Sequence, residues 1–323
     1  MLGVLPLSTL AQGSLTPSGP PAPTMKSLDQ IEPRTPISSL PFTITTSGSY
    51  YLTTNLTAAS NGITISTNNV TLDLNGFALV GLPASGKGIS FTAQTNVTVR
   101  NGVVSGWGSG GVYAALSDAR NLVFERLVVS GCGGSGILCG GQGTLRNCVV
   151  SLNGSIGIAL YGGEITDCEA SYNGSGGISA IHCIVRNCRA ANNGTDGIYI
   201  APGTVLGCLA ENNGFSGIYV DAPGSTAIGN TCIGNNTSAN ATRAGIYVND
   251  ANNRIEDNHV TASGYAGISV NNFSTYTNNI IIKNSVRGNG ANNYVTPGNQ
   301  IVGPLITTYG TITNSNPWAN FSY

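Results

Sequence analysis

The feature that most constrains this chain is a repeat of 20 residues. A cysteine, an Asn-Gly pair and a Gly-Ile pair each recur four times at that interval. The positions are Cys148, Cys168, Cys188 and Cys208; Asn153, Asn173, Asn193 and Asn213; and Gly157, Gly177, Gly197 and Gly217. A fixed step of this size predicts a solenoid, in which each repeat forms one coil and contacts only its neighbours. Chemistry in such a fold must lie on an outer face or in an inserted loop.

The composition favours one elongated domain with few charges. Of 323 residues, 41% are hydrophobic and 8% are charged, and the formal net charge is −1. This apolar content is enough for a long core. No basic stripe is present, so we expect no nucleic-acid partner. After the N-terminus, no apolar run approaches the ~18 residues of a membrane span.

Residues 1–13 predict a signal-peptide remnant. The segment 1–10 is apolar, and Ala11-Gln12-Gly13 offers small residues at the −3 and −1 positions of a cleavage site, although a basic n-region is missing. The alternative is a disordered apolar tail. Residues 14–41 are proline-rich and predict an extended lead-in. The expected location is therefore secreted or at the cell surface.

The chain has eight cysteines, which in an exported protein would normally indicate disulfides. Cysteines one coil apart, however, stack about 4.8 Å from each other with parallel Cβ directions. The repeat therefore predicts a buried column of small apolar thiols. A straight column is also a poor zinc site, because tetrahedral ligands must converge. A local bridge stays open for the cysteines off the column, which are Cys132, Cys139, Cys183 and Cys232.

Each coil is expected to hold three short strands. The glycine that opens the strand Gly-Ile-x-Val marks the coils at Gly62, Gly88, Gly111, Gly136, Gly157, Gly177, Gly197, Gly217, Gly245 and Gly267. Just before the four cysteines lie Asn147, Asp167, Asn187 and Gly207. These residue types tolerate a left-handed backbone and predict a bend. Asn230, Asn258 and Asn284 continue the cysteine column and predict an internal ladder of asparagine amides.

Three strands per coil, rungs near 20 residues, left-handed bends and an asparagine ladder resemble the right-handed parallel β-helix of the pectin-lyase-like superfamily. Within that superfamily the chain resembles the "right-handed β-helix region" repeat proteins. Residues 69–77 (NVTLDLNGF) and 96–103 (NVTVRNGV) are similar to the N-terminal rungs of that group. The resemblance implies an all-β, single-stranded solenoid of about 10 coils over residues 42–295.

The two ends of the solenoid are expected to carry caps, because terminal repeats are atypical. Residues 42–56 alternate in the manner of a hairpin and predict an N-terminal β cap. Residues 296–323 predict a C-terminal plug built on Trp318, Phe321 and Tyr323. An aromatic sorting or secretion tag is the alternative interpretation of this tail.

One outward column of side chains predicts a binding surface. Side chains alternate along a strand, so the third residue of Gly-Ile-x-Val faces outward. This column holds Tyr199, Tyr219 and Tyr247, followed by Asn249 and Asp250. Aromatic rings stack on sugar rings and polar groups bond hydroxyls, so we predict a polysaccharide or cell-surface glycan as the ligand. The alternative is that tyrosine simply suits a sheet surface.

This sequence carries only fragments of the catalytic signatures that the superfamily's enzymes have. Its lyases pair an acidic calcium cluster with an arginine, and its polygalacturonase-like branch uses several aspartates with Gly-His-Gly. Neither His182 nor His259 lies in Gly-His-Gly. Asp196 and Asp221 are weak catalytic candidates, since glycosidases need two carboxyls about 5–10 Å apart. No cofactor is expected otherwise, although Asp221 and Asp250, with Asn249, are weak candidates as calcium ligands.

Three functions therefore compete. The sequence favours a secreted or surface β-helix that binds polysaccharide without catalysis. The alternatives are a structural or adhesive surface spacer, and a divergent polysaccharide lyase, glycoside hydrolase or epimerase. The coil between Gly217 and Gly245 is the longest, at 28 residues, and its insertion at 235–243 marks the expected place of any site.

Overall fold

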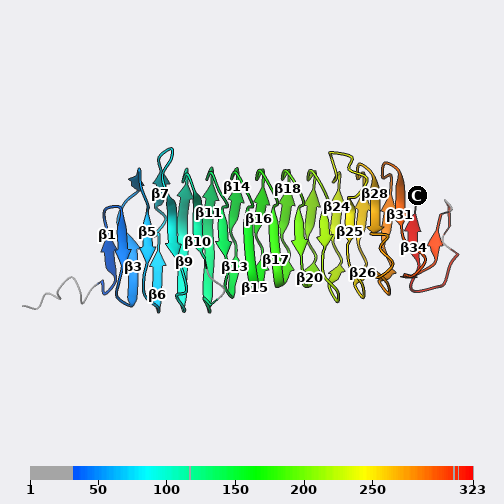
Figure 1. Ribbon diagram of the computed structural model, residues 1–323, viewed down its shortest axis with the longest axis horizontal. Coiled ribbons are helices and arrows are strands. Elements are labelled where there is room, and N and C mark those ends of the chain that lie inside the picture. Colours follow the sequence, from blue (N-terminus) through cyan, green and yellow to red (C-terminus); the bar gives the residue numbers. More distant parts are fainter. Residues whose placement is uncertain (1–31, 116–117, 308–309, 312, 323) are drawn as a thin grey trace, which may run out of the picture. The chain divides into compact units, whose positions relative to one another are not determined.

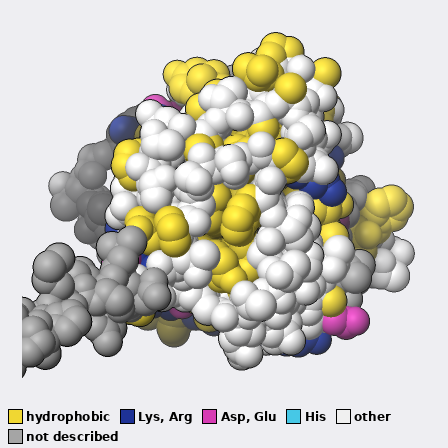
Figure 2. Space-filling view, turned by 90° about the vertical axis from the view of Figure 1, so that its left-hand side faces the viewer, with side chains coloured by type: hydrophobic (Ala, Val, Ile, Leu, Met, Phe, Trp, Pro, Cys, Tyr) yellow, Lys and Arg dark blue, Asp and Glu magenta, His cyan; other side chains and the backbone are white. Residues whose placement is uncertain are grey.

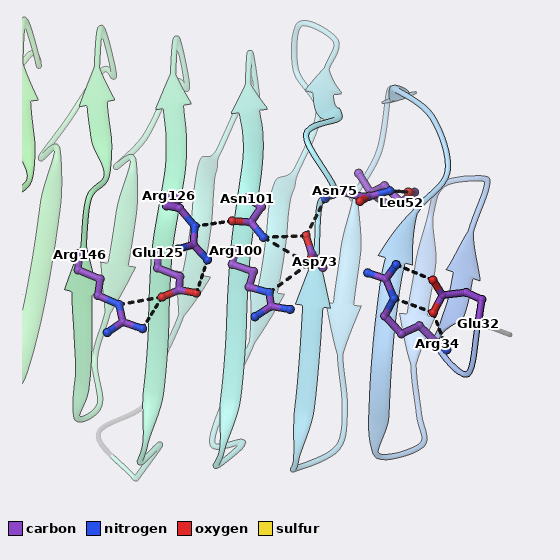
Figure 3. A network of polar contacts seen from close by, with 10 residues as sticks. All are labelled: Glu32, Arg34, Leu52, Asp73, Asn75, Arg100, Asn101, Glu125, Arg126 and Arg146. Carbon is purple, nitrogen blue, oxygen red and sulfur yellow. Dashed lines mark hydrogen bonds and ion pairs between the residues drawn. The ribbon is translucent and has the colours of Figure 1, made fainter. Parts of the chain in front are cut away.

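A computed structural model of the chain describes residues 32–115, 118–307, 310–311 and 313–322. The chain divides into two units, residues 1–34 and residues 35–323. The predicted signal remnant, most of the lead-in and Tyr323 lie outside the described residues. In the first unit, the guanidinium of Arg34 bonds the carboxylate of Glu32 at 2.7 Å (Figure 3).

The second unit is a stack of short parallel strands wound around one core, which makes about 12 turns (Figure 1). Its described residues form 34 strands, and every pairing between these strands is parallel. The described part of the chain has no helix able to cross a membrane. The predicted all-β solenoid is confirmed. The first and last turns lack the Gly-Ile marker, which is why the sequence indicated only about 10 coils.

The strands form three faces, each one strand wide and running the length of the stack. Face 1 consists of β2 (Phe42–Ile44), β5 (Ile63–Ile65), β8 (Lys87–Phe91), β10 (Gly110–Ala114), β12 (Ile137–Cys139), β15 (Ile158–Thr166), β17 (Ile178–Arg186), β19 (Ile198–Ile200), β22 (Ile218–Val220), β25 (Ala244–Val248), β28 (Ala266–Val270) and β31 (Asn292–Val295).

Face 2 follows face 1 along the chain. It consists of β1 (Thr35–Ile37), β3 (Gly48–Leu52), β6 (Val70–Asp73), β9 (Val97–Ser105), β11 (Leu122–Ser130), β13 (Gly143–Arg146), the later parts of β15 and β17, β20 (Gly203–Leu206), β23 (Thr226–Ile228), β26 (Arg254–Glu256), β29 (Ile280–Ile282) and β32 (Ile301–Val302).

Face 3 completes each coil. It consists of β4 (Leu56–Ala58), β7 (Ala78–Gly81), the later parts of β9 and β11, β14 (Val149–Ser151), β16 (Glu169–Ser171), β18 (Arg189–Ala191), β21 (Leu209–Glu211), β24 (Thr231–Ile233), β27 (His259–Thr261), β30 (Ser285–Arg287) and β34 (Asn320–Ser322), with β33 (Leu305–Ile306) paired to β34.

The predicted N-terminal hairpin is wrong. Strands β2, β3 and β4 pair in parallel with β5, β6 and β7, as the later coils do, and β1 pairs in parallel with β3. Residues 42–58 are thus a regular coil. Alternation of apolar and polar residues is common to hairpins and parallel coils, so the pattern alone could not separate them. The C-terminal tail likewise joins the stack, through β32 and β34.

The predicted bends are confirmed. Asn147, Asp167, Asn187 and Gly207 have φ of 55, 52, 52 and 61°. A second left-handed column, which the sequence did not reveal, ends face 3. It includes Leu152, Tyr172, Asn192 and Asn212, with φ of 59, 55, 55 and 53°.

The cysteine column lies in the core as predicted. Its four cysteines are between 1% and 3% exposed. All eight cysteines are free and buried, which contradicts the alternative of a local bridge. The asparagine ladder that continues the column is also confirmed. The amide of Asn230 donates to Asn258 at 3.0 Å, Asn258 donates to Asn284 at 2.9 Å, and Asn284 extends the ladder to Asn320 at 3.1 Å.

A second buried ladder runs through the asparagines of the four Asn-Gly pairs and continues to Asn235. Asn153, Asn173, Asn193, Asn213 and Asn235 are bonded side chain to side chain at 2.9–3.0 Å. The sequence indicated only turns at these positions. Each amide also bonds a backbone carbonyl of the preceding coil, so the ladder joins successive rungs.

On the outside of face 2, charges of alternating sign stand on successive rungs (Figure 3). Asp73 pairs with Arg100 at 3.1 Å, and Glu125 bonds Arg146 at 2.7 Å. Opposite charges one rung apart support one register of stacking. Charge is otherwise sparse: at the end of the stack seen in Figure 2, hydrophobic side chains gather at the centre and few charged ones are visible.

We expect this unit to lose stability in acid, in part through Asp73. Burial alone would raise the pKa of Asp73, but the N–H of Asn75, the amide of Asn101 and the guanidinium of Arg100 together lower it below its usual value. A lowered folded-state pKa contributes stability above the unfolded value of about 3.9, and that contribution is lost as the pH falls through the folded value.

Melting followed by circular dichroism between pH 6 and pH 2 checks this. Asp73→Asn should melt lower than the parent at pH 6, and the difference should shrink toward pH 2. A difference that is constant across this range would contradict the role of the Asp73 carboxylate.

Candidate functional site

Three tyrosines stand in register on the outside of face 1. Tyr199 on β19 pairs with Tyr219 on β22, which pairs with Tyr247 on β25. The ring centroids are 5.4 Å apart for the first two and 5.5 Å apart for the last two. We call these residues the tyrosine face. The alternation of side chains along a strand accounts for their alignment, and their role in binding stays a prediction.

The insertion at 235–243 covers part of the tyrosine face. The guanidinium of Arg243 lies 4.8 Å from the ring centroid of Tyr219, 5.4 Å from that of Tyr247 and 5.5 Å from that of Phe215. A cation over aromatic rings is attracted by their quadrupoles. Tyr247 is only 6% exposed as a result of this packing and of its contacts with Ala244 and Ala266.

The expectation that Tyr247 is exposed is therefore wrong, because alternation gives the direction of a side chain and not what covers it. Tyr199 and Tyr219 remain partly exposed. Sequence reasoning also missed Arg243 and Phe215. Only their positions in the sequence could have pointed to these two residues. Arg243 ends the longest insertion, and Phe215 lies in the turn just before β22.

Asp221 organises the polar groups beside the tyrosines. One carboxylate oxygen accepts a hydrogen bond from the hydroxyl of Tyr199 at 2.9 Å, and the other accepts one from the amide of Asn249 at 2.7 Å. Asn271 donates in turn to Asn249 at 2.6 Å. Burial, followed by this contact with Asp221, raises the pKa of Tyr199 to about 12. The Tyr199 ring is thus held in one orientation, in its neutral form.

Asp196 lies beside the tyrosine face, with its side chain 14% exposed. It accepts a hydrogen bond from the backbone N–H of Ser216 at 2.8 Å, and Nε of Arg243 lies 3.8 Å from its carboxylate. Burial raises the pKa of Asp196, and the negative charge of Asp221 adds to this, while Ser216 and Arg243 oppose it. The raised pKa shows that burial outweighs the favourable partners.

A cavity of about 200 Å³ opens between Asp196 and Tyr199. Its other lining residues are Ile156, Ser175, Gly176, Ile178, Ser179 and Thr195. The structure therefore brings Tyr199 and Asp196 to one cavity, with Asp221 and Asn249 linked to it through the Tyr199 hydroxyl. Asp250 takes no part in this network, since its carboxylate accepts from the N–H of Ala251 at 2.7 Å in its own turn.

The role of Asp221 and Asp250, with Asn249, as calcium ligands stays a prediction. Both carboxylate oxygens of Asp221 accept hydrogen bonds, and one oxygen of Asp250 accepts a hydrogen bond within its own turn. Within residues 32–115, 118–307, 310–311 and 313–322, no three His, Cys, Asp or Glu side chains are grouped so that they could hold a metal ion.

Two family profiles match the sequence. The first, described as "Right handed beta helix region", matches residues 87–233. The second, described as "Periplasmic copper-binding protein (NosD)", matches residues 179–303. No curated protein matches the sequence of this chain.

Several solved structures share the fold. The A-module of a mannuronan C-5 epimerase from Azotobacter vinelandii is 16% identical over 79% of this chain and 90% of that one, with a TM-score of 0.57. The catalytic domain of a GH87 α-1,3-glucanase, solved with tetrasaccharides, is 14% identical over 95% and 71%, with a TM-score of 0.54. A GH87 α-1,3-glucanase from Streptomyces thermodiastaticus is 12% identical over 91% and 64%, with a TM-score of 0.52. Identities this low show the fold alone.

The described residues do not fit a copper centre of the kind that the second profile names. His182 lies in β17 and His259 in β27, on different faces of the coil. The thiols of the cysteine column are buried, and each lies within hydrogen-bond distance of a backbone carbonyl. Imidazole and thiolate are the copper ligands that proteins use most, and here they do not converge.

Proposed function

Because this chain is a right-handed parallel β-helix repeat protein, we propose that it is an extracytoplasmic protein that binds a polysaccharide without catalysis, through Tyr199 and Tyr219. The apolar N-terminus and the periplasmic description that matches residues 179–303 support the location. The mannuronan epimerase and the glucanase bound to tetrasaccharides are similar folds whose names refer to polysaccharides, which supports the ligand class.

The observation that carries the proposal is the pair of rings on neighbouring rungs. Tyr199 and Tyr219 are partly exposed and their ring centroids lie 5.4 Å apart, and Tyr199 also lines the cavity that holds Asp196. Partly exposed rings offer apolar faces to a sugar, while carboxylates and amides accept and donate hydrogen bonds to hydroxyls. Tyr247 and Arg243 support these rings from one side, so their role is to position Tyr219 rather than to touch the ligand.

We expect the double variant Tyr199→Ala/Tyr219→Ala to bind its polysaccharide at least ~100-fold more weakly, because buried aromatic contacts dominate such interfaces. Affinity electrophoresis against a panel of acidic and neutral polysaccharides measures the loss. Tyr113→Ala is the matched control, since Tyr113 occupies the same outward column of face 1 four rungs earlier. Undiminished retention of the double variant by every polysaccharide that retains the parent would reject the tyrosine face as the site.

Catalysis is the second candidate, favoured by the raised pKa of the Asp196 carboxyl next to Asp221. A carboxyl that keeps its proton is the type of group that donates it to a glycosidic oxygen. The parent protein would then generate new reducing or unsaturated ends in the same panel, and Asp196→Asn would abolish them. If the parent yields no product but binds, the non-catalytic function stands; if it neither binds nor cleaves, the spacer role replaces both.

A further inference from the structure

A corner of the coil outside the tyrosine face carries two side chains in an unfavourable backbone conformation. At the end of face 3, successive coils place one residue in the left-handed region: Gly131, Leu152, Tyr172, Asn192, Asn212 and Gly234, with φ between 53 and 65°. Glycine and asparagine tolerate this conformation, whereas a leucine or tyrosine is strained there. Leu152 and Tyr172 thus depart from the residue types that the same corner uses elsewhere.

Packing does not offset this strain. Leu152 is 65% exposed and Tyr172 is 58% exposed, which makes them two of the most exposed large hydrophobic side chains of the described residues. The Tyr172 hydroxyl makes no hydrogen bond within the described part of the chain. Residues that hold a strained backbone, without packing or hydrogen bonds that compensate for it, are characteristic of functional positions.

The two side chains border a groove of about 650 Å³. The groove also takes in Asn192 and Asn212 from the next two coils and Thr237 and Ser238 from the insertion. Among described residues, the side-chain amides of Asn192 and Asn212 have no hydrogen-bond partner, so they are available to a ligand. None of the residues that line the groove is charged; the remaining ones are Asn173, Asn193, Gly194 and Gly214.

We propose that this corner groove binds a neutral glycan chain. Tyr172 and Leu152 supply an apolar platform for sugar rings, and the two free amides supply donors and acceptors for hydroxyls. An uncharged lining favours an uncharged ligand, because a buried ionic group would find no counter-charge. Rungs repeat at about 4.8 Å, so equivalent groups recur along the groove as they do along a polymer. This site is separate from the tyrosine face and does not depend on it.

The decisive variant is Tyr172→Asn, which installs the residue that Asn192 and Asn212 provide in the next two coils. We expect it to bind neutral glycan at least tenfold more weakly while its melting temperature stays equal or rises, since the strain is relieved. A purely structural Tyr172 predicts the reverse, a lower melting temperature with unchanged binding. His182→Asn is the matched control: His182 is exposed, has φ of 55° and lies at a different corner, between faces 1 and 2.

The probes are dextran, laminarin, mannan and xyloglucan in affinity electrophoresis at low and high salt. At least one of these glycans should retard the parent and His182→Asn equally, at both salt concentrations. The same glycan should retard Tyr172→Asn much less. Retardation by none of them, or equal retardation of the parent and Tyr172→Asn, would overturn the proposal. The double variant Tyr199→Ala/Tyr219→Ala separates the two sites, because it should keep its affinity for the probe that the corner groove binds.

Discussion

Asn258→Ala should lower the free energy of unfolding by about 3–5 kcal/mol, because it leaves several buried polar groups without partners. The side-chain carbonyl oxygen of Asn258 accepts hydrogen bonds from the backbone N–H and the side-chain amide of Asn230, at 2.9 and 3.0 Å. Its amide donates to the carbonyl of Ala227 and to Asn284, both at 2.9 Å. All of these contacts lie inside the stack, where water cannot replace them.

Denaturant unfolding followed by circular dichroism measures this effect. The matched variant is Asn258→Cys, since the same column holds cysteines in four coils, and Cys208 accepts from the N–H of Cys188 through sulfur at 3.4 Å. We expect Asn258→Cys to lose less stability than Asn258→Ala. Equal and small losses for both variants would show that the ladder contributes little.

Gly177→Ala should cost about 3 kcal/mol by overpacking, which is a large effect for the addition of one methyl group. A Cβ at this position would lie 2.6 Å from the amide nitrogen of Asn193 and 2.7 Å from the carbonyl oxygen of Gly197. Both belong to the next rung, which is held in register by β19, so neither can move away without breaking strand pairing. Neighbouring rungs approach each other closely at this point. This is therefore the reason why the strands of the Gly-Ile-x-Val pattern begin with glycine.

The neighbouring residue gives the control for this prediction. A Cβ on Gly176 would meet its nearest atom, the carbonyl oxygen of Asp196, at 3.4 Å, which is an ordinary contact. Gly176→Ala should leave the unfolding midpoint unchanged or raise it slightly. Similar midpoints for Gly176→Ala and Gly177→Ala would contradict the close-approach argument.

Much of the fold followed from single residues counted at a fixed interval. Asn147 and its equivalents predicted the bends, and Asn230 and Asn258 predicted the first ladder. The second ladder through Asn173 and Asn193 was missed, because Asn-Gly is also a common turn sequence. Nothing in the pattern separates an asparagine that ends a strand from one whose amide is buried between rungs.

The candidate site was predictable only in part. The alignment of Tyr199 with Tyr219 follows from alternation and repeat length. The covering of Tyr247 by Arg243 does not, since it depends on the path of an insertion that follows no repeat. The strained corner at Tyr172 was equally hidden, because a tyrosine in a sequence carries no mark of its backbone angle.

The sequence by itself determined the coil, its inward columns and the order of residues along each face, because in a solenoid every coil packs on its nearest neighbours and a repeat in sequence becomes a column in space. Only the tertiary structure decided which outward side chains stay open to solvent, which carboxylates are already bonded, and where a groove forms. Those properties arise where the insertion and the corners meet residues 20 or more positions away, and contacts of that kind depend on the path of the folded chain.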